Sequence, residues 1–137
     1  MKKTARRLRK DKRGILATEH EDSVMVADWL RWHKIFFLHI PNEGKRSWNE
    51  GKKQKRIGMR KGAPDFLIFP PPLYRPQACG TALELKRLED GIVEEEQEDF
   101  LEQIGKYGWH TMICQGGDEA IKRLKELGYG KKGEEGG

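Results

Sequence analysis

Two apolar, strand-like runs that carry charged residues constrain this chain more than any other feature. The first run is Asp65–Phe69 (DFLIF) and the second is Thr81–Arg87 (TALELKR). The prolines at 70–72 lie between them and cannot continue a central strand, so the first run must end there. Successive side chains of a strand point to opposite faces, so Glu84 and Lys86 share one face and the leucines between and before them share the other. We expect the leucines to face a core and the charged pair to face a cleft.

The charged residues of these runs are typical of a metal-dependent hydrolytic site. Asp65 begins the first run, and pairing of the two strands can bring its carboxylate beside Glu84. Two carboxylates held that close repel each other unless a cation lies between them, and hard oxygen ligands favour Mg²⁺ or Mn²⁺. Lys86 can orient an attacking water, help to deprotonate it, or neutralise charge that grows on a phosphate. The alternative interpretation is a salt bridge across strands at the surface.

Periodic patterns predict the elements around these strands. A helix is expected from Thr18 to about His33, and its apolar stripe consists of Ser23, Val26, Ala27 and Leu30. The other expected elements are strands at 34–40 and 109–114 and helices at 94–108 and 118–127. The order α–β–β–β–α–β–α predicts the mixed α/β class, with a small mixed sheet flanked by helices. Three tryptophans are expected in or beside the core: Trp29, Trp32 and Trp109.

Length and charge indicate the organisation of the chain. At 137 residues, one domain at 18–127 is expected between a flexible basic arm at 1–17 and a flexible tail at 128–137. The net charge is +5, and basic residues cluster at 2–13 and 45–61, which favours a polyanionic partner such as nucleic acid. The first cluster is equally consistent with a solvated tail.

Several classes of protein are disfavoured by the sequence. No apolar run is long enough to span a membrane, and the N-terminus lacks the apolar segment of a secretory signal, so we expect a cytoplasmic protein without a membrane partner. Cys79 and Cys114 form no CxxC pair, and the histidines do not complete a zinc site, so both cysteines are expected to be reduced and structural.

Beyond these patterns, GAPDFLIF and ALELKR resemble the PD-(D/E)xK nuclease superfamily, and the wider chain resembles its virus-type replication-repair nuclease (VRR-NUC) branch. The resemblance covers roughly residues 18–127 and includes TEHEDSVMVADWL, HIPNEGKR, EEEQEDFLEQIGKYG and CQGGDEAIKRL. It implies a restriction-endonuclease-like core and a DNA endonuclease that requires Mg²⁺ or Mn²⁺. It also implies, for a stand-alone phage-type member, a homodimer that acts on branched DNA such as a Holliday junction or a flap, in the cytoplasm of a bacterial host.

Site residues carried over from the resemblance coincide with the charged strand residues. The resemblance assigns Asp65 and Glu84 as metal ligands, the backbone carbonyl of Leu85 as a further ligand, and Lys86 as the catalytic lysine. Members also place a glutamate on the first helix, which matches Glu19.

Three further positions on the helices remain open. Helical spacing from Ser23 also puts Glu19 at the edge of the apolar stripe, and Glu21 is the alternative first-helix acid. Members often carry a glutamine where this chain has Ser23, so no role is inferred there. Gln97 matches a glutamine that can support the site, and it is equally an ordinary polar residue near a helix start.

The resemblance also places a DNA-binding region around PNEGKR and the basic stretch that follows. The candidate DNA-binding residues are Asn42, Lys45, Arg46, Lys52, Lys53, Lys55, Arg56, Arg60 and Lys61. Two other functions are compatible with the sequence: a non-catalytic nucleic-acid-binding module and a general endonuclease that acts on linear DNA.

Overall fold

The computed structural model describes residues 19–41, 56–58, 60–86 and 93–131. Within these ranges, the element order is the one that the sequence predicted. The elements are α1 (Glu19–Trp32), β1 (Phe37–His39), β2 (Phe66–Ile68), β3 (Thr81–Lys86), α3 (Glu95–Lys106), β4 (His110–Gln115) and α4 (Gly117–Glu126).

The strands form a mixed sheet in the order β1-β2-β3-β4. The two pairs β1–β2 and β2–β3 are antiparallel, whereas β3 and β4 are parallel and are connected through α3. In the β2–β3 register, Phe66 lies opposite Leu83. Asp65 directly precedes β2. Extending the register by one residue places it opposite Glu84, next to the charged pair of β3. The predicted mixed α/β class is confirmed.

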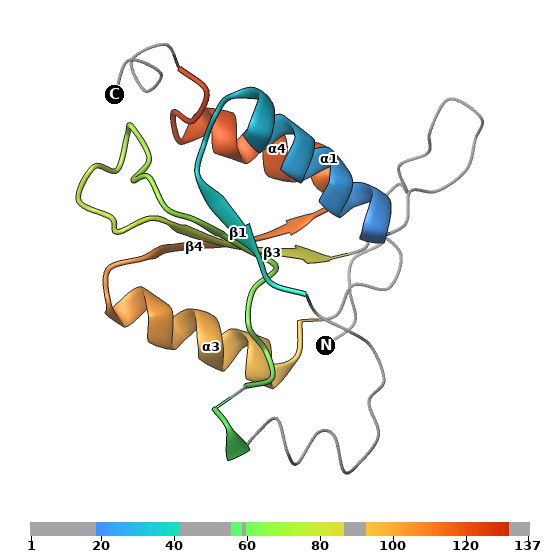
Figure 1. Cartoon of the computed structure of the whole chain (residues 1–137). Helices are drawn as coiled ribbons and strands as arrows, with labels where there is room; N and C mark the ends of the chain where they lie inside the picture. Colours follow the sequence, from blue (N-terminus) through green and yellow to red (C-terminus); the bar gives the residue numbers. More distant parts are fainter. Residues whose placement is uncertain (1–18, 42–55, 59, 87–92, 132–137) are drawn as a thin grey trace.

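Helices cover both faces of the sheet. Figure 1 shows α1 and α4 together on one side and α3 on the other. The core lies mainly between the sheet and the α1–α4 layer, and the expected leucine face of β3 is buried in it. Its fully buried side chains include Val26, Leu30, Phe66, Ile68, Leu83, Ala120 and Leu124. Among the described residues, no helix has the length and apolar character needed to cross a membrane.

Two details around the end of α1 differ from the sequence expectations. The first strand is limited to Phe37–His39 rather than beginning at residue 34, because Lys34 follows α1 in a left-handed conformation, with a φ of 57°. Trp32 is 81% exposed instead of packing near the core, because a residue two positions after the buried Leu30 points to the opposite side of a helix.

The folded chain also continues past residue 127, where the domain was expected to end. Tyr129 is only 1% exposed and belongs to the core cluster. Its hydroxyl donates to the Pro70 carbonyl at 2.6 Å and lies 2.9 Å from Thr81 Oγ1. These contacts fasten the end of α4 to the start of β3 and to the β2–β3 connection.

Candidate active site

The chain that leads to Asp65 is fixed against α3. Gly62 has a φ of +88°, and a Cβ at this position would overlap the backbone carbonyl of Glu96. Only glycine tolerates both the positive φ and the missing space, so Gly62 itself allows this loop to lie against the backbone of α3. At the other side, the Ile40 amide donates to the Asp65 carbonyl at 2.8 Å. Asp65 is therefore held between β1 and the first turn of α3.

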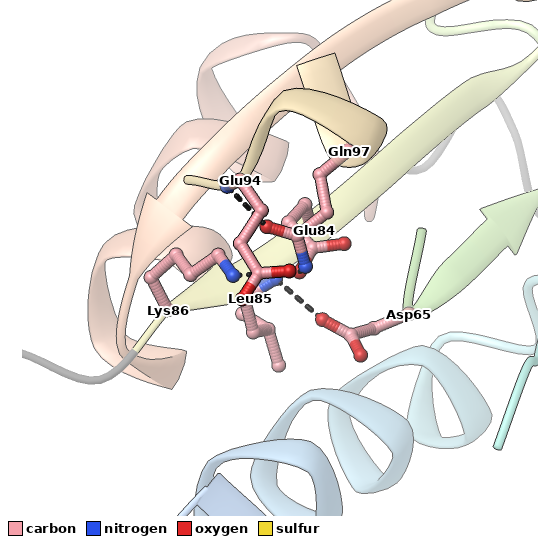
Figure 2. Close-up of polar contacts among 6 residues, drawn as sticks. All are labelled: Asp65, Glu84, Leu85, Lys86, Glu94 and Gln97. Carbon is pink, nitrogen blue, oxygen red and sulfur yellow. Dashed lines mark hydrogen bonds and ion pairs between the residues drawn. The ribbon is translucent and has the colours of Figure 1, made fainter. Parts of the chain in front are cut away.

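The carboxylate of Asp65 turns toward the neighbouring strand. Its Oδ2 accepts a hydrogen bond from the backbone N–H of Leu85 at 2.7 Å, as Figure 2 shows. A β3 amide thus orients the aspartate, and this contact commits only one of its two oxygens. The predicted juxtaposition of Asp65 with the charged strand residues is present in the structure.

Glu84 is the buried member of the group, with 2% of its surface exposed. Its Oε2 accepts a hydrogen bond from Gln97 Nε2 at 2.8 Å and lies 3.4 Å from Lys86 Nζ. Within the described part of the chain, Glu84 Oε1 is buried and has no hydrogen-bond partner. A buried oxygen without a hydrogen-bond partner lowers the stability of the folded protein. This atom is therefore suited to binding a ligand that the protein does not itself supply.

Gln97 connects the site to the start of α3. Its Oε1 accepts a hydrogen bond from the backbone N–H of Glu94 at 3.0 Å, as part of a capping box. Because this contact occupies the amide oxygen, the amide NH₂ faces Glu84 (Figure 2). Both sequence interpretations of Gln97 thus describe real contacts: it is a helix N-terminal residue and it touches the buried carboxylate.

The strand face that carries Glu84 and Lys86 is covered more closely than the sequence pattern indicated. The sequence pattern correctly placed Glu84 and Lys86 on the face opposite the leucines, but α3 covers that face and Gln97 lies directly on Glu84. The side chain of Lys86 is only 12% exposed. The charged pair is therefore enclosed by a helix rather than directed into open solvent.

Burial and mutual repulsion disfavour the ionised carboxylates. Burial, followed by the charge of Asp65, raises the pKa of Glu84 to about 8, and the positive charge of Lys86 only partly offsets this. The pKa of Asp65 is raised as well, mainly by burial, while the Leu85 amide and the charge of His39 act in the opposite direction. Additional positive charge between the two carboxylates would favour their ionised forms.

These donors fit a hard divalent cation. Asp65 and Glu84 supply carboxylate oxygens, and the partnerless Oε1 of Glu84 belongs to this pair. Among the described residues, no three histidine, cysteine, aspartate or glutamate side chains gather closely enough to hold a metal ion. Mg²⁺ is commonly bound by one or two carboxylates, with water and phosphate oxygens completing its octahedron, and the donor set matches that pattern.

The acid of the first helix also acts on this pair. Glu19 is exposed at the start of α1, and its negative charge contributes to the raised pKa of both Asp65 and Glu84. The assignment of Glu19, with Glu21 as the alternative, stays a prediction.

Most of the candidate DNA-binding residues lie outside the described residues. Those outside are Asn42, Lys45, Arg46, Lys52, Lys53 and Lys55. Arg56, Arg60 and Lys61 are described and exposed. The guanidinium of Arg60 lies over the Phe100 ring at 5.9 Å, a cation–π distance that associates Arg60 with α3. Their role in DNA binding stays a prediction.

Two further residues, one buried in α1 and one beside Asp65, were given no role from the sequence. Asp22 is buried in α1, and its spacing with Val26 and Leu30 is a strict repeat of four that could have indicated an inward position in place of Ser23. His39 ends β1, stacks near Phe66 and acts electrostatically on Asp65. No sequence signal distinguishes His39 from an ordinary strand residue, because its proximity depends on the β1–β2 register.

Comparison with known proteins supports the fold. A solved structure described as "VRR_NUC domain protein" superimposes with a TM-score of 0.66 at 24% sequence identity. The alignment covers 81% of this chain and 88% of that chain. No family model matches the sequence, and no curated protein matches it. The chain thus has the fold of a VRR_NUC domain protein, with four strands in a mixed sheet.

Proposed function

We propose that this chain is a divalent-metal-dependent DNA endonuclease that hydrolyses phosphodiester bonds. The observation that carries the proposal is the convergence of Asp65, Glu84 and Lys86 at one end of the β2–β3 pair, where one buried carboxylate oxygen has no partner among the described residues. The shared fold with a VRR_NUC domain protein agrees with this chemistry. Gln97 joins the group through its hydrogen bond to Glu84.

Asp65 and Glu84 would hold Mg²⁺ or Mn²⁺, together with the backbone carbonyl of Leu85. Glu19, from the first helix, does not gather with them as a third carboxylate in this structure, and it would join the ion by a movement of its exposed side chain. Such an ion supplies Lewis-acid polarisation of a phosphoryl oxygen and lowers the pKa of a bound water. Gln97 orients Glu84 by donating to Oε2, which leaves Oε1 directed away from that contact. Glu84 must release the proton that its raised pKa favours before it can serve as a ligand.

Lys86 provides a positive charge inside the site. Its ammonium group lies 3.4 Å from Glu84 Oε2 and carries protons that can be donated to a phosphate oxygen or to a water. A lysine in this position neutralises charge that develops on the phosphate during attack, which is the larger of its possible contributions. Lys86 is therefore the catalytic residue that we expect to be least replaceable.

The substrate is proposed to be DNA, with a preference for branched structures such as a Holliday junction or a flap. The basic residues at 45–61, which include the exposed Arg56, Arg60 and Lys61, would contact phosphates, since neutralising backbone charge drives binding without reading sequence. A homodimer and a cytoplasmic location accompany this proposal through the family resemblance described above.

Cleavage of matched four-way, flap, splayed and linear DNAs tests the function. Each DNA is incubated in Mg²⁺, Mn²⁺ or EDTA with the wild type, with Lys86→Ala, and with Lys122→Ala as a control at an exposed lysine of α4. We expect metal-dependent nicking by the wild type and by the control, and a loss of at least about 100-fold in Lys86→Ala. DNA binding at fixed salt should change little in Lys86→Ala.

The same experiment separates the alternatives. Tight binding without strand scission in any metal would contradict the nuclease and favour the non-catalytic binding module. Equal cleavage of all four DNAs would support a general endonuclease and contradict the proposed preference for branched DNA.

A further inference from the structure

Asp22 is a buried carboxylate that the proposed chemistry does not use. It lies in the first turn of α1 and is 3% exposed. Its Oδ1 accepts a hydrogen bond from the backbone N–H of Gly117 at 3.0 Å. Gly117 is the first residue of α4, whose N-cap residue Gly116 provides no side-chain cap. Because the first N–H groups of a helix have no acceptor within it, Asp22 caps α4 from another helix.

The junction between the two helices is close as well as polar. A Cβ on Gly117 would lie 2.8 Å from Met25 Sδ and 3.1 Å from the Asp22 carbonyl oxygen. The glycine thus allows the backbones of the two first turns to approach each other directly. Apolar packing and a charge-assisted hydrogen bond fix the start of α1 to the start of α4.

This junction lies next to the first-helix acid. Glu19 precedes Asp22 by three residues, so the two side chains lie on neighbouring positions of one helix face. Glu19 is exposed and begins α1, where helices tend to fray, yet its charge acts on both Asp65 and Glu84. α1 contacts β3, and Figure 1 shows the start of α1 near the end of that strand. A fixed first turn would limit how far the exposed Glu19 can move away from these strands.

We propose that Asp22 is a positioning residue that anchors the first turn of α1 to α4 and thereby holds Glu19 toward the Asp65–Glu84 pair. The inference rests on the proposed function, since it assigns Glu19 to metal binding. Asp22 touches neither substrate nor metal in this arrangement. It acts through Glu19, and its removal should change metal affinity rather than the chemistry at Lys86.

A double-mutant cycle tests this coupling. Mn²⁺ binding is measured by titration calorimetry in the absence of DNA for Asp22→Ala, Glu19→Gln and the double variant. Asp22→Ala should weaken Mn²⁺ binding by about 10-fold, the usual scale for residues that orient a ligand. In the Glu19→Gln background the same substitution should have no further effect. Asp22→Asn keeps an acceptor for the Gly117 N–H and should retain near wild-type affinity.

Two controls separate positioning from a general loss of structure. Asp28→Ala removes an exposed aspartate of α1 that pairs with Arg31 at 2.9 Å, and it should leave Mn²⁺ affinity unchanged. Circular dichroism checks the fold of each variant. Should Asp22→Ala unfold, Asp22→Ser, with a shorter polar side chain, replaces it in the cycle. In cleavage assays, Asp22→Ala should raise the Mn²⁺ concentration required for half-maximal rate and leave the rate at saturating Mn²⁺ within about threefold.

The outcomes distinguish this inference from the proposed function. Equal losses of Mn²⁺ affinity in the wild-type and Glu19→Gln backgrounds, or unchanged affinity in a folded Asp22→Ala protein, would overturn the positioning role and leave the nuclease intact. A wild type that neither binds Mn²⁺ nor cleaves DNA would overturn both.

Discussion

Replacement of Glu84 by glutamine should make the metal-free protein more stable, and increasingly so as the pH rises. Burial raises the pKa of Glu84 from an ordinary value of 4.5 to about 8, with the charge of Asp65 as the next cause. Between these two pH values the folded protein keeps a proton on Glu84 that the unfolded chain has released. The free energy of unfolding therefore falls as the pH increases from 4.5 to 8. Below pH 4.5 Glu84 is protonated in both states and no longer makes this free energy depend on pH.

The size of the effect follows from the shift. At about 1.4 kcal/mol for each pH unit, a rise from 4.5 to about 8 corresponds to roughly 5 kcal/mol across the whole range. Asp65 adds to the difference in the same direction, because in Glu84→Gln it no longer faces a second carboxylate. The variant should therefore gain about 3 to 4 kcal/mol relative to the wild type between pH 5 and pH 8.

Urea unfolding in EDTA, followed by tryptophan fluorescence at pH 5, 6, 7 and 8, measures this difference directly. Glu102→Gln, at an exposed glutamate of α3, is the matched control and should show no comparable trend. Saturating Mn²⁺ should reverse the ranking at pH 8, since the ion binds only the ionised carboxylates. A difference between Glu84→Gln and wild type that stays within about 0.5 kcal/mol across this range would refute the assignment of Glu84 as a desolvated acid.

Two further substitutions test how the scaffold holds the site. Gly62→Ala should destabilise the protein by more than about 2 kcal/mol, because φ is +88° and the added Cβ would overlap the backbone of α3. Gly58→Ala is its control in urea unfolding: φ is +99° but nothing lies within 4 Å, so about 1 kcal/mol is expected, and equal losses would contradict the close approach. Tyr129→Phe should cost about 1 to 3 kcal/mol, since Thr81 and Pro70 lose their partner. An unchanged thermal midpoint would show that this anchor is dispensable.

The sequence predicted the elements well because their signals are local. Alternation in Thr81–Lys86 placed the leucines on the core face and the charged pair on the other, and the prolines at 70–72 predicted the end of β2 to within one residue. Helix bounds followed the apolar period of α1 and α3 to within two residues. These patterns arise between residues that are close in sequence, so they do not depend on contacts between distant parts of the chain.

The candidate site was predicted in its composition but not in its environment. The pairing of Asp65 with the β3 residues followed from the expected strand order. The enclosure of Glu84 by α3 did not, because the coverage of a strand face depends on where a later helix packs. Trp32 was misplaced because it lies two positions after the buried Leu30, on the opposite side of α1.

The sequence alone determined which groups are available: two carboxylates, a lysine on the same strand face, and a glutamine at the start of the next helix. Tertiary structure decided their protonation and their partners. Desolvation by α3 and repulsion from Asp65 raise the pKa of Glu84, and both depend on packing between separate elements. The cap that Asp22 places on Gly117 spans 95 residues of sequence. Such contacts carry no local periodicity, because they arise only when the two helices meet on the same face of the sheet.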